Sequence, residues 1–250
     1  MPIVRKFAAS ALLLALAAAA PAQQGGDLQA QILYAFHSED SNALQNLVQE
    51  LSRQVKQDAG DASLRYHLAH AQYRRGLLAG AGVGARAAQP ALSDCIEELK
   101  PVLSQDVKSV EALILQSACY GALADQGKLE SVLLRSRSEE RLKSALALAP
   151  RNPRAVFLSS MEALSRAKTG TADQQRAFAR LQVAAELFDA SSATSIDSPG
   201  WGHAEAYLAL GRELQARGDQ VGARNWIEKS LIVAPDYKAA QRQLAQLVRR

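Results

Sequence analysis

The sequence predicts an all-α protein in which pairs of short helices follow one another along the chain as a solenoid. Apolar residues recur at three- and four-residue spacing and are interrupted by Gly, Asp and Pro, as in amphipathic helices joined by turns. Aromatic residues make up only 5% of the 250 residues, and alanine is abundant. This composition favours helices packed through small side chains over a sandwich or barrel. Because the linkers are short, neighbouring helices are expected to be antiparallel.

The first 22 residues have the pattern of a secretory signal peptide. Arg5 and Lys6 precede an apolar run that ends at Ala20, and small residues at Ala20 and Ala22 suit a signal peptidase. The run has about 14 residues, fewer than the roughly 20 that span a bilayer. We expect cleavage after Ala22; the alternative is an uncleaved anchor. The alanine-rich signal is typical of a bacterium, which predicts a periplasmic protein, with full secretion as the alternative.

Neither lipidation nor nucleic-acid binding is expected of the mature chain. Its first cysteine is Cys95, far from the cleavage site, so the chain lacks a lipid acceptor there and no stable membrane anchor is predicted. The formal net charge is +4, but loss of Arg5 and Lys6 leaves 27 basic against 25 acidic residues. This near balance lacks the basic excess of nucleic-acid-binding proteins.

The mature chain is expected to divide into a helical leader over residues 23–60 and a repeat domain over residues 61–250. The leader contains helices over 27–37 and 40–56, and the second carries an apolar stripe that includes Leu44, Val48, Leu51 and Val55. Such a stripe has to be buried against another element. The repeat domain contains nine predicted helices, over residues 62–79, 90–104, 107–124, 136–149, 153–168, 173–188, 203–217, 220–234 and 236–248.

Internal similarity separates a solenoid from a plain helical bundle, which is the alternative architecture. Segments beginning at Leu68, Leu115 and Leu210 align with one another, and two partner helices end alike at Pro150 and Pro235. Residues 204–237 resemble a tetratricopeptide repeat (TPR). The matching residues are Tyr207, Leu210, Gly211, Ala223, Ile227 and Pro235, while Leu214 and Ser230 depart from the motif. Overall the chain resembles secreted bacterial TPR proteins of uncharacterised role.

The remaining repeats are degenerate. The aligned residues Leu68, Leu115, Leu158 and Leu210 are 47, 43 and 52 residues apart, whereas a strict repeat has a period of about 34. We expect the extra residues in loops over 76–89, 124–135 and 189–202. The prediction is therefore an α-solenoid of four TPR-like helix pairs, preceded by the leader and followed by a capping helix.

The two cysteines, Cys95 and Cys119, are candidates for a disulfide in an exported protein. In a solenoid they fall on neighbouring helices, the second helix of the first pair and the first helix of the next. The alternative is a pair of buried, unpaired side chains, and the residues alone leave both open. The absence of a Cys-x-x-Cys motif argues against a redox-active pair.

The resemblance implies a concave surface built from the first helix of each pair. The protein-binding positions that it assigns carry tyrosine, arginine and other polar side chains, and tyrosine and arginine are frequent interface anchors. The alternative for the tyrosines is packing between helices. The candidate groove residues are Tyr66, His70, Tyr73, Arg74, Tyr120, Arg212 and Gln215.

The sequence contains no motif that predicts catalysis. It lacks Gly-x-Ser-x-Gly, His-Glu-x-x-His and nucleotide-binding signatures, so we expect neither catalytic residues nor a cofactor. His67 and His70 are three residues apart, but no third ligand accompanies them, and no metal site is predicted. The expected function is binding of an envelope protein or peptide. The alternatives are homo-oligomeric self-assembly capped by Trp226 or Tyr237, and a small-ligand or metal carrier.

Overall fold

The computed structural model describes residues 21–127, 130–192 and 199–248 of the chain. Residues 1–20 of the predicted signal peptide lie outside this range. The described residues form eleven α-helices and no strand. Their bounds are α1 Pro21–His37, α2 Ser41–Gln57, α3 Ala62–Gly82, α4 Ala85–Gln105, α5 Val110–Ala124, α6 Ser131–Leu148, α7 Pro153–Arg166, α8 Ala172–Ser192, α9 His203–Ala216, α10 Gln220–Val233 and α11 Lys238–Val248.

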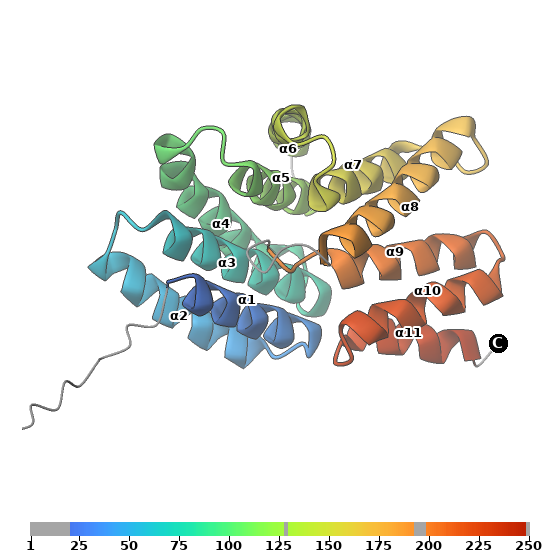
Figure 1. The fold of residues 1–250 in the computed structure, drawn as a ribbon, viewed down its shortest axis with the longest axis horizontal. Helices are drawn as coiled ribbons and strands as arrows, with labels where there is room; N and C mark the ends of the chain where they lie inside the picture. The colour runs from blue at the N-terminus through green and yellow to red at the C-terminus, as the bar shows by residue number, and fades with distance from the viewer. Residues whose placement is uncertain (1–20, 128–129, 193–198, 249–250) are drawn as a thin grey trace, which may run out of the picture.

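The helices are arranged as four consecutive antiparallel pairs, and the predicted all-α solenoid is confirmed. The most extensive packing joins α3 with α4, α5 with α6, α7 with α8 and α9 with α10. The helices α1 and α2 precede the first pair, and α11 follows the last (Figure 1). None of the helices in the described ranges combines the length and apolar character that a membrane crossing requires.

The prediction that the extra residues lie in long loops is wrong for the first two pairs. α3 continues past Gly76 to Gly82, and α4 begins at Ala85 although Pro90 then falls inside the helix. Pro90 cannot donate a backbone hydrogen bond. The longer helices nevertheless bury Ala88, Ala91 and Leu92 between them, and this packing offsets the lost bond. Likewise α6 begins at Ser131, which leaves a short connection after α5. The third predicted loop is shortened rather than lost, because α8 extends to Ser192 and α9 begins at His203.

Local side-chain caps define where several helices begin. The carboxylates of Asp40, Asp61 and Asp219 accept hydrogen bonds from the backbone N–H groups three residues later, and Asn152 accepts from those of Arg154 and Ala155. Such a cap stabilises a helix by about 1 kcal/mol. Pro153 follows its cap at the first position of α7, where the missing N–H carries no penalty.

The close approach of α9 and α10 depends on a residue of the repeat motif. A Cβ atom on Gly211 would lie 2.5 Å from Cγ1 of Ile227 and 3.0 Å from the carbonyl oxygen of Ala223. Gly211, Ala223 and Ile227 are all buried at this contact. The small side chains at motif positions 211 and 223 therefore set the spacing of the pair.

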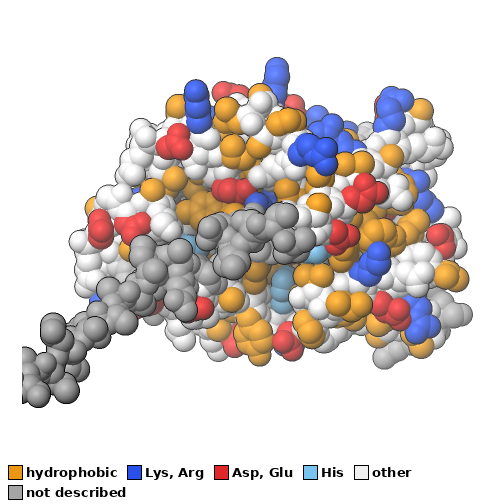
Figure 2. Space-filling model, in the orientation of Figure 1, with side chains coloured by type: hydrophobic (Ala, Val, Ile, Leu, Met, Phe, Trp, Pro, Cys, Tyr) orange, Lys and Arg blue, Asp and Glu red, His pale blue; other side chains and the backbone are white. Residues whose placement is uncertain are grey.

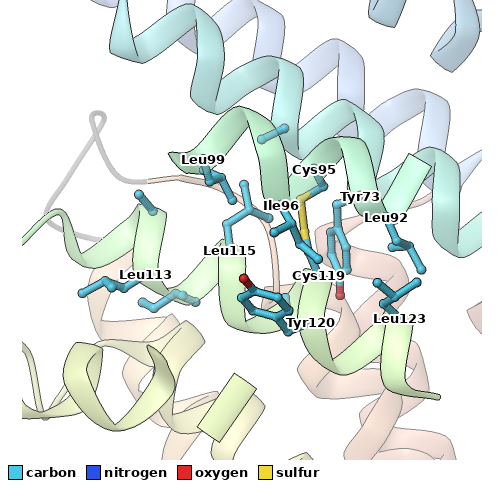
Figure 3. Packing of buried hydrophobic residues seen from close by; sticks show 14 of the residues in the cluster. Tyr73, Leu92, Cys95, Ile96, Leu99, Leu113, Leu115, Cys119, Tyr120 and Leu123 are labelled. Carbon is cyan, nitrogen blue, oxygen red and sulfur yellow. A yellow bond between two sulfur atoms is a disulfide. The ribbon is translucent and has the colours of Figure 1, made fainter. Parts of the chain in front are cut away.

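The largest buried cluster lies where the first and second pairs meet. A disulfide joins Cys95 of α4 to Cys119 of α5, with a Cα–Cα distance of 6.3 Å (Figure 3). Leu92, Leu99 and Leu115 pack in the same cluster. Both cysteines are fully buried, so the covalent link lies inside the core rather than on the surface.

The two ends of the solenoid meet. In Figure 1 the array curves from α2 over α5 and α6 and returns at α11 beside the leader. The guanidinium of Arg242 in α11 binds the carboxylate of Glu39, in the turn between α1 and α2. Nearby, the ring of Tyr237 lies 4.4 Å from His37 and 6.3 Å from Phe36, measured between centroids. The curved array is thus closed by contacts between its first and last helices.

Candidate functional site

The inner side of the curve is built from the first helix of each pair, as the resemblance implies, but much of it is occupied by the chain itself. Residues 199–202, which lead into α9, pass near the centre of the molecule (Figure 1). We call these four residues the strap. Trp201 in the strap is 2% exposed, and its indole N–H donates to the hydroxyl of Tyr66 at 3.1 Å. Its ring also lies 5.9 Å from His70 and 6.3 Å from Tyr73.

Arg74 is the charged centre of this inner cluster. Its side chain is 2% exposed, and Nη2 lies 2.8 Å from Oε1 of Glu205, the third residue of α9. Its Nε donates to Nε2 of His70 at 3.0 Å. The guanidinium also stacks over Phe36 of α1 at 4.4 Å from the ring centroid. One side chain therefore connects the leader, the first helix pair and the last.

Burial and charge shift the pKa values of this cluster in a consistent direction. Burial by itself raises the pKa of Glu205, but the charge of Arg74 and the contact with His37 outweigh it and hold the pKa far below its usual value. Burial, followed by the positive charge of Arg74, keeps the pKa of His70 well below its usual value. The cluster therefore consists of an ionised carboxylate, a guanidinium and a neutral imidazole at neutral pH.

A second arginine fastens the strap to the middle of the array. Arg154 of α7 is 3% exposed and forms a bidentate pair with Glu111 of α5, at 2.8 and 2.7 Å. Asn152 donates to the same carboxylate at 2.7 Å. Nη1 of Arg154 donates to the carbonyl oxygen of Pro199. The strap is thus anchored at Pro199 by the second and third pairs and at Trp201 by the first.

The predicted groove residues therefore fall into two groups. Tyr66, His70, Tyr73 and Arg74 lie together and contact the strap. His70, Tyr73 and Arg74 are buried and Tyr66 is half-buried, so these four residues do not form an open groove. Tyr120 is also buried, within the core around the disulfide. Arg212 is exposed and Gln215 half-buried on α9, where both contact Gln243 of α11.

Trp201, Glu111 and Arg154 hold the inner surface in place, although no motif assigns them a role. A tryptophan between two glycines, in Pro199-Gly200-Trp201-Gly202, was the available signal, since such a residue in a connection needs a site in which to be buried. Gly202 has φ of 102° and a Cβ there would lie 2.7 Å from Phe188. Only glycine meets both demands at this turn.

An open pocket of about 280 Å³ remains on the inner side, beyond the strap. We call it the inter-repeat pocket, because α3, α5, α6 and α7 of three successive pairs contribute to it. Tyr73 is the predicted groove residue that it includes. Its lining residues are Tyr73, Leu77, Ser117, Ala118, Gly121, Ala122, Asp125, Arg135, Ser138, Leu158, Met161, Glu162, Ser165 and Arg166.

A serine pair and a glutamate form the polar part of the inter-repeat pocket. The hydroxyl of Ser138 lies 3.0 Å from that of Ser117 and 2.9 Å from both the carbonyl oxygen of Ser117 and Oε1 of Glu162. Because Ser138 has a single proton to donate, it serves one of these two acceptors at a time. Burial raises the pKa of Glu162, against the lowering effects of Ser138 and Arg166.

Charged side chains of both signs surround the opening. Arg135 pairs with Asp125 at 2.9 Å, and Arg166 lies 2.9 Å from Glu139 and 3.4 Å from Glu162. On the face drawn in Figure 2, lysine and arginine side chains are interspersed with aspartate and glutamate. The inter-repeat pocket therefore has no large excess of positive or negative charge. Its distinguishing feature is the half-buried carboxylate of Glu162 among exposed ion pairs.

The remaining sequence-based candidates are placed as follows. His67 and His70 both lie on α3 and are buried, and within the described residues no group of three His, Cys, Asp or Glu side chains is arranged to hold a metal ion. Tyr237 packs against Phe36 and His37, so it is not an exposed cap. Trp226 is partly buried against Tyr207 and lies beneath the ammonium of Lys229.

Comparison with solved structures identifies the architecture. A thermophilic TPR protein of Thermus thermophilus superimposes with a TM-score of 0.63 at 19% identity, over 92% of this chain and 100% of that one. The fold is that of a TPR solenoid. Yeast Tom70 also matches, with a TM-score of 0.32 at 13% identity, over 96% of this chain and 59% of that one. The sequence matches no protein-family model and no curated protein. The similarity to the Thermus protein therefore shows the fold alone.

Proposed function

We propose that this chain is an exported, non-catalytic TPR protein that binds another protein or a peptide in the bacterial cell envelope. The observation that carries this proposal is the inter-repeat pocket, which opens on the inner helices α3, α5 and α7 while the strap fills the neighbouring surface. Inner helices of successive repeats form a preformed surface, so a partner segment is bound without ordering the receptor.

The composition of the pocket supports a peptide partner. Leu77, Leu158 and Met161 provide an apolar wall, and Asp125 and Arg135 are polar groups at its edge. An apolar centre within a polar rim is the usual anatomy of a protein interface. Met161 is 36% exposed and thus available to a partner. Arg212 and Gln215, on the surface of α9, remain predicted contacts for a longer segment.

Capture from cells tests the binding proposal. A carboxy-terminally tagged protein would be crosslinked in cells and purified, alongside Met161→Lys and Val221→Lys variants. Val221 is 73% exposed on α10 and serves as the matched control for adding a charge to a helix surface. We expect a stoichiometric envelope protein that is lost with Met161→Lys and retained with Val221→Lys. Equal capture by both variants contradicts the pocket assignment, and recovery of untagged copies alone indicates self-assembly instead.

Export has a separate test, because it rests on the amino-terminal sequence. The protein would be recovered from periplasmic and cytoplasmic fractions and its amino terminus sequenced. We expect a periplasmic protein that begins at Gln23, after cleavage following Ala22. A cytoplasmic protein that retains Arg5 and Lys6 contradicts the export proposal but leaves the binding proposal intact.

A further inference from the structure

Among the residues that line the inter-repeat pocket, Glu162 is the half-buried carboxylate, and it shares its nearest cation with another carboxylate. Its side chain is 28% exposed, against 65% for Asp125 and 46% for Glu139. The guanidinium of Arg166 is shared, and it lies closer to Glu139 (2.9 Å) than to Glu162 (3.4 Å). Glu162 also accepts from the neutral hydroxyl of Ser138, and the charge of Arg135 acts on it more weakly than that of Arg166. A carboxylate in this position benefits from a second cation.

The charge balance around the opening points the same way. Two carboxylates and two guanidinium groups line the pocket, those of Asp125 and Glu162 and those of Arg135 and Arg166, and Glu139 outside the lining also pairs with Arg166. Both arginines are about half exposed, at 49% and 55% of their side chains. Each of them therefore keeps an exposed partner, Asp125 or Glu139, if another cation takes the place beside Glu162.

The volume and apolar wall limit what such a cation can be. About 280 Å³ is just below the range of about 300–1,000 Å³ found for small-molecule sites, which suits one long side chain. Leu77, Leu158 and Met161 line the pocket together with Glu162. Lysine and arginine match this combination, because each has an apolar stem and a cationic end.

We infer that the inter-repeat pocket recognises a lysine or arginine side chain of the partner, with Glu162 binding its cationic end and Leu77, Leu158 and Met161 contacting its stem. The inference rests on the proposed function and adds the chemical class of the partner's anchor residue. An acidic side chain beside Glu162 would be repelled by its carboxylate, and the two arginines of the lining already pair with Asp125, Glu139 and Glu162. An apolar side chain would bury the Glu162 carboxylate further without a partner.

Short peptides test this preference without knowledge of the natural partner. Capped pentapeptides Ala-Ala-X-Ala-Ala, with X as arginine, lysine, norleucine or glutamate, would be titrated to millimolar concentration into the ¹⁵N-labelled protein. Backbone amide shifts of residues 117–125 and 158–166 report on the pocket. We expect saturable shifts there with the arginine and lysine peptides only. Norleucine supplies the same apolar stem without the charge and is the matched control.

A pair of isosteric variants tests the role of Glu162. Glu162→Gln keeps the shape and removes the charge, and we expect it to weaken binding of the arginine peptide by about tenfold. Glu228→Gln makes the same change in another i,i+4 pair, with Arg224 on α10, and should leave binding unchanged. Circular dichroism and thermal unfolding would show that both variants remain folded.

The outcomes separate this inference from the proposed function. Equal or tighter binding of the norleucine or glutamate peptide in the pocket overturns the basic-residue inference and leaves a peptide-binding pocket. Retained arginine binding by folded Glu162→Gln overturns the role of Glu162. If no peptide shifts these amides, the basic-residue inference is overturned, and capture from cells then decides whether the proposed function fails as well.

Discussion

Arg74 of α3 and Glu205 of α9 form a buried ion pair, 2.8 Å from Nη2 to Oε1, that joins the first helix pair of the solenoid to the last. The side chains are 2% and 13% exposed. Because Arg74 is buried and Glu205 is only slightly exposed, the loss of one partner leaves the other poorly hydrated and unpaired. The closure of the array therefore depends on both.

Glu205→Gln should lower the free energy of unfolding by about 3 kcal/mol, the usual cost of removing one partner of a buried pair. The amide oxygen can still accept the backbone N–H of Gly202, so the cap on α9 remains while the charge is lost. Urea unfolding followed by circular dichroism measures the change. Glu228→Gln, in an exposed pair, should change the stability by less than about 0.5 kcal/mol. Equal effects of the two substitutions would refute a special role for the buried pair.

The Trp201 side chain should be the main contribution of the strap to stability. Trp201→Ala removes a fully buried indole, and a loss of about 4 kcal/mol is expected from the cavity and the lost contacts. Trp201→Phe keeps most of the packing but leaves the hydroxyl of Tyr66 without its donor, at a cost of about 1 kcal/mol. Chemical unfolding of both variants gives the comparison. A Trp201→Ala protein as stable as the wild type would show that the strap does not hold the inner surface together.

Stability should fall as the pH is lowered below about 6.5. The pKa of His70 is depressed by burial and by Arg74, so the unfolded chain takes up a proton on His70 before the folded protein does. Its stabilising contribution is complete above the unfolded pKa, near 6.5, and decreases as the pH falls toward the folded pKa. His67, whose pKa is also lowered by burial, acts in the same direction. Glu205, with its lowered pKa, adds a further loss below about 4.5.

Urea unfolding between pH 8 and pH 5 measures this dependence. The free energy of unfolding should change by up to about 1.4 kcal/mol per pH unit for each proton taken up on unfolding. The variant His70→Gln cannot take up this proton, and its stability should depend less steeply on pH. Parallel curves for the variant and the wild type would show that His70 does not contribute.

Reduction of the Cys95–Cys119 disulfide should destabilise the protein by about 3 kcal/mol, as expected for a link that closes a loop with a sequence separation of 24. Unfolding is compared with and without a reductant, beside the Cys95→Ala, Cys119→Ala double variant. The double variant should show no response to the reductant. Because both sulfur atoms are buried, the wild type should respond to a mild reductant only when it unfolds. Rapid reduction of the folded protein would contradict the buried position of the bond.

Gly211→Ala should destabilise the α9–α10 pair by about 1–3 kcal/mol, because the added Cβ would meet Ile227 at 2.5 Å. Gly82→Ala is the matched control. Gly82 ends α3 and a Cβ there has no atom within 4 Å, so alanine should be neutral or slightly stabilising. Thermal unfolding compares the stabilities of the two variants. A Gly211→Ala protein more stable than the wild type would mean that α9 and α10 can move apart to accommodate the Cβ without losing stability.

The helices and their pairing were predictable because their causes are local. The periodicity of Leu44, Val48 and Leu51 predicts one buried face of a helix, and Asp61 and Asn152 cap the helices that follow them. The lengths of α3 and α4 were not predictable in the same way. Gly76 and Pro90 indicate helix ends locally, yet packing of Ala88 and Leu92 extends both helices. Tertiary burial overrode the local preference.

The sequence by itself determined the helix-pair architecture, the TPR motif of residues 204–237, and the set of tyrosines and arginines on the inner helices. Only the tertiary structure decided what those side chains contact. The curvature of a solenoid accumulates from small rotations between successive pairs, and no local pattern encodes the sum. The curvature brings Glu205 to Arg74 and Trp201 to Tyr66. These contacts fill the groove that the sequence predicted. The same geometry leaves Glu162 and Met161 beside an open pocket, which is where we place the partner.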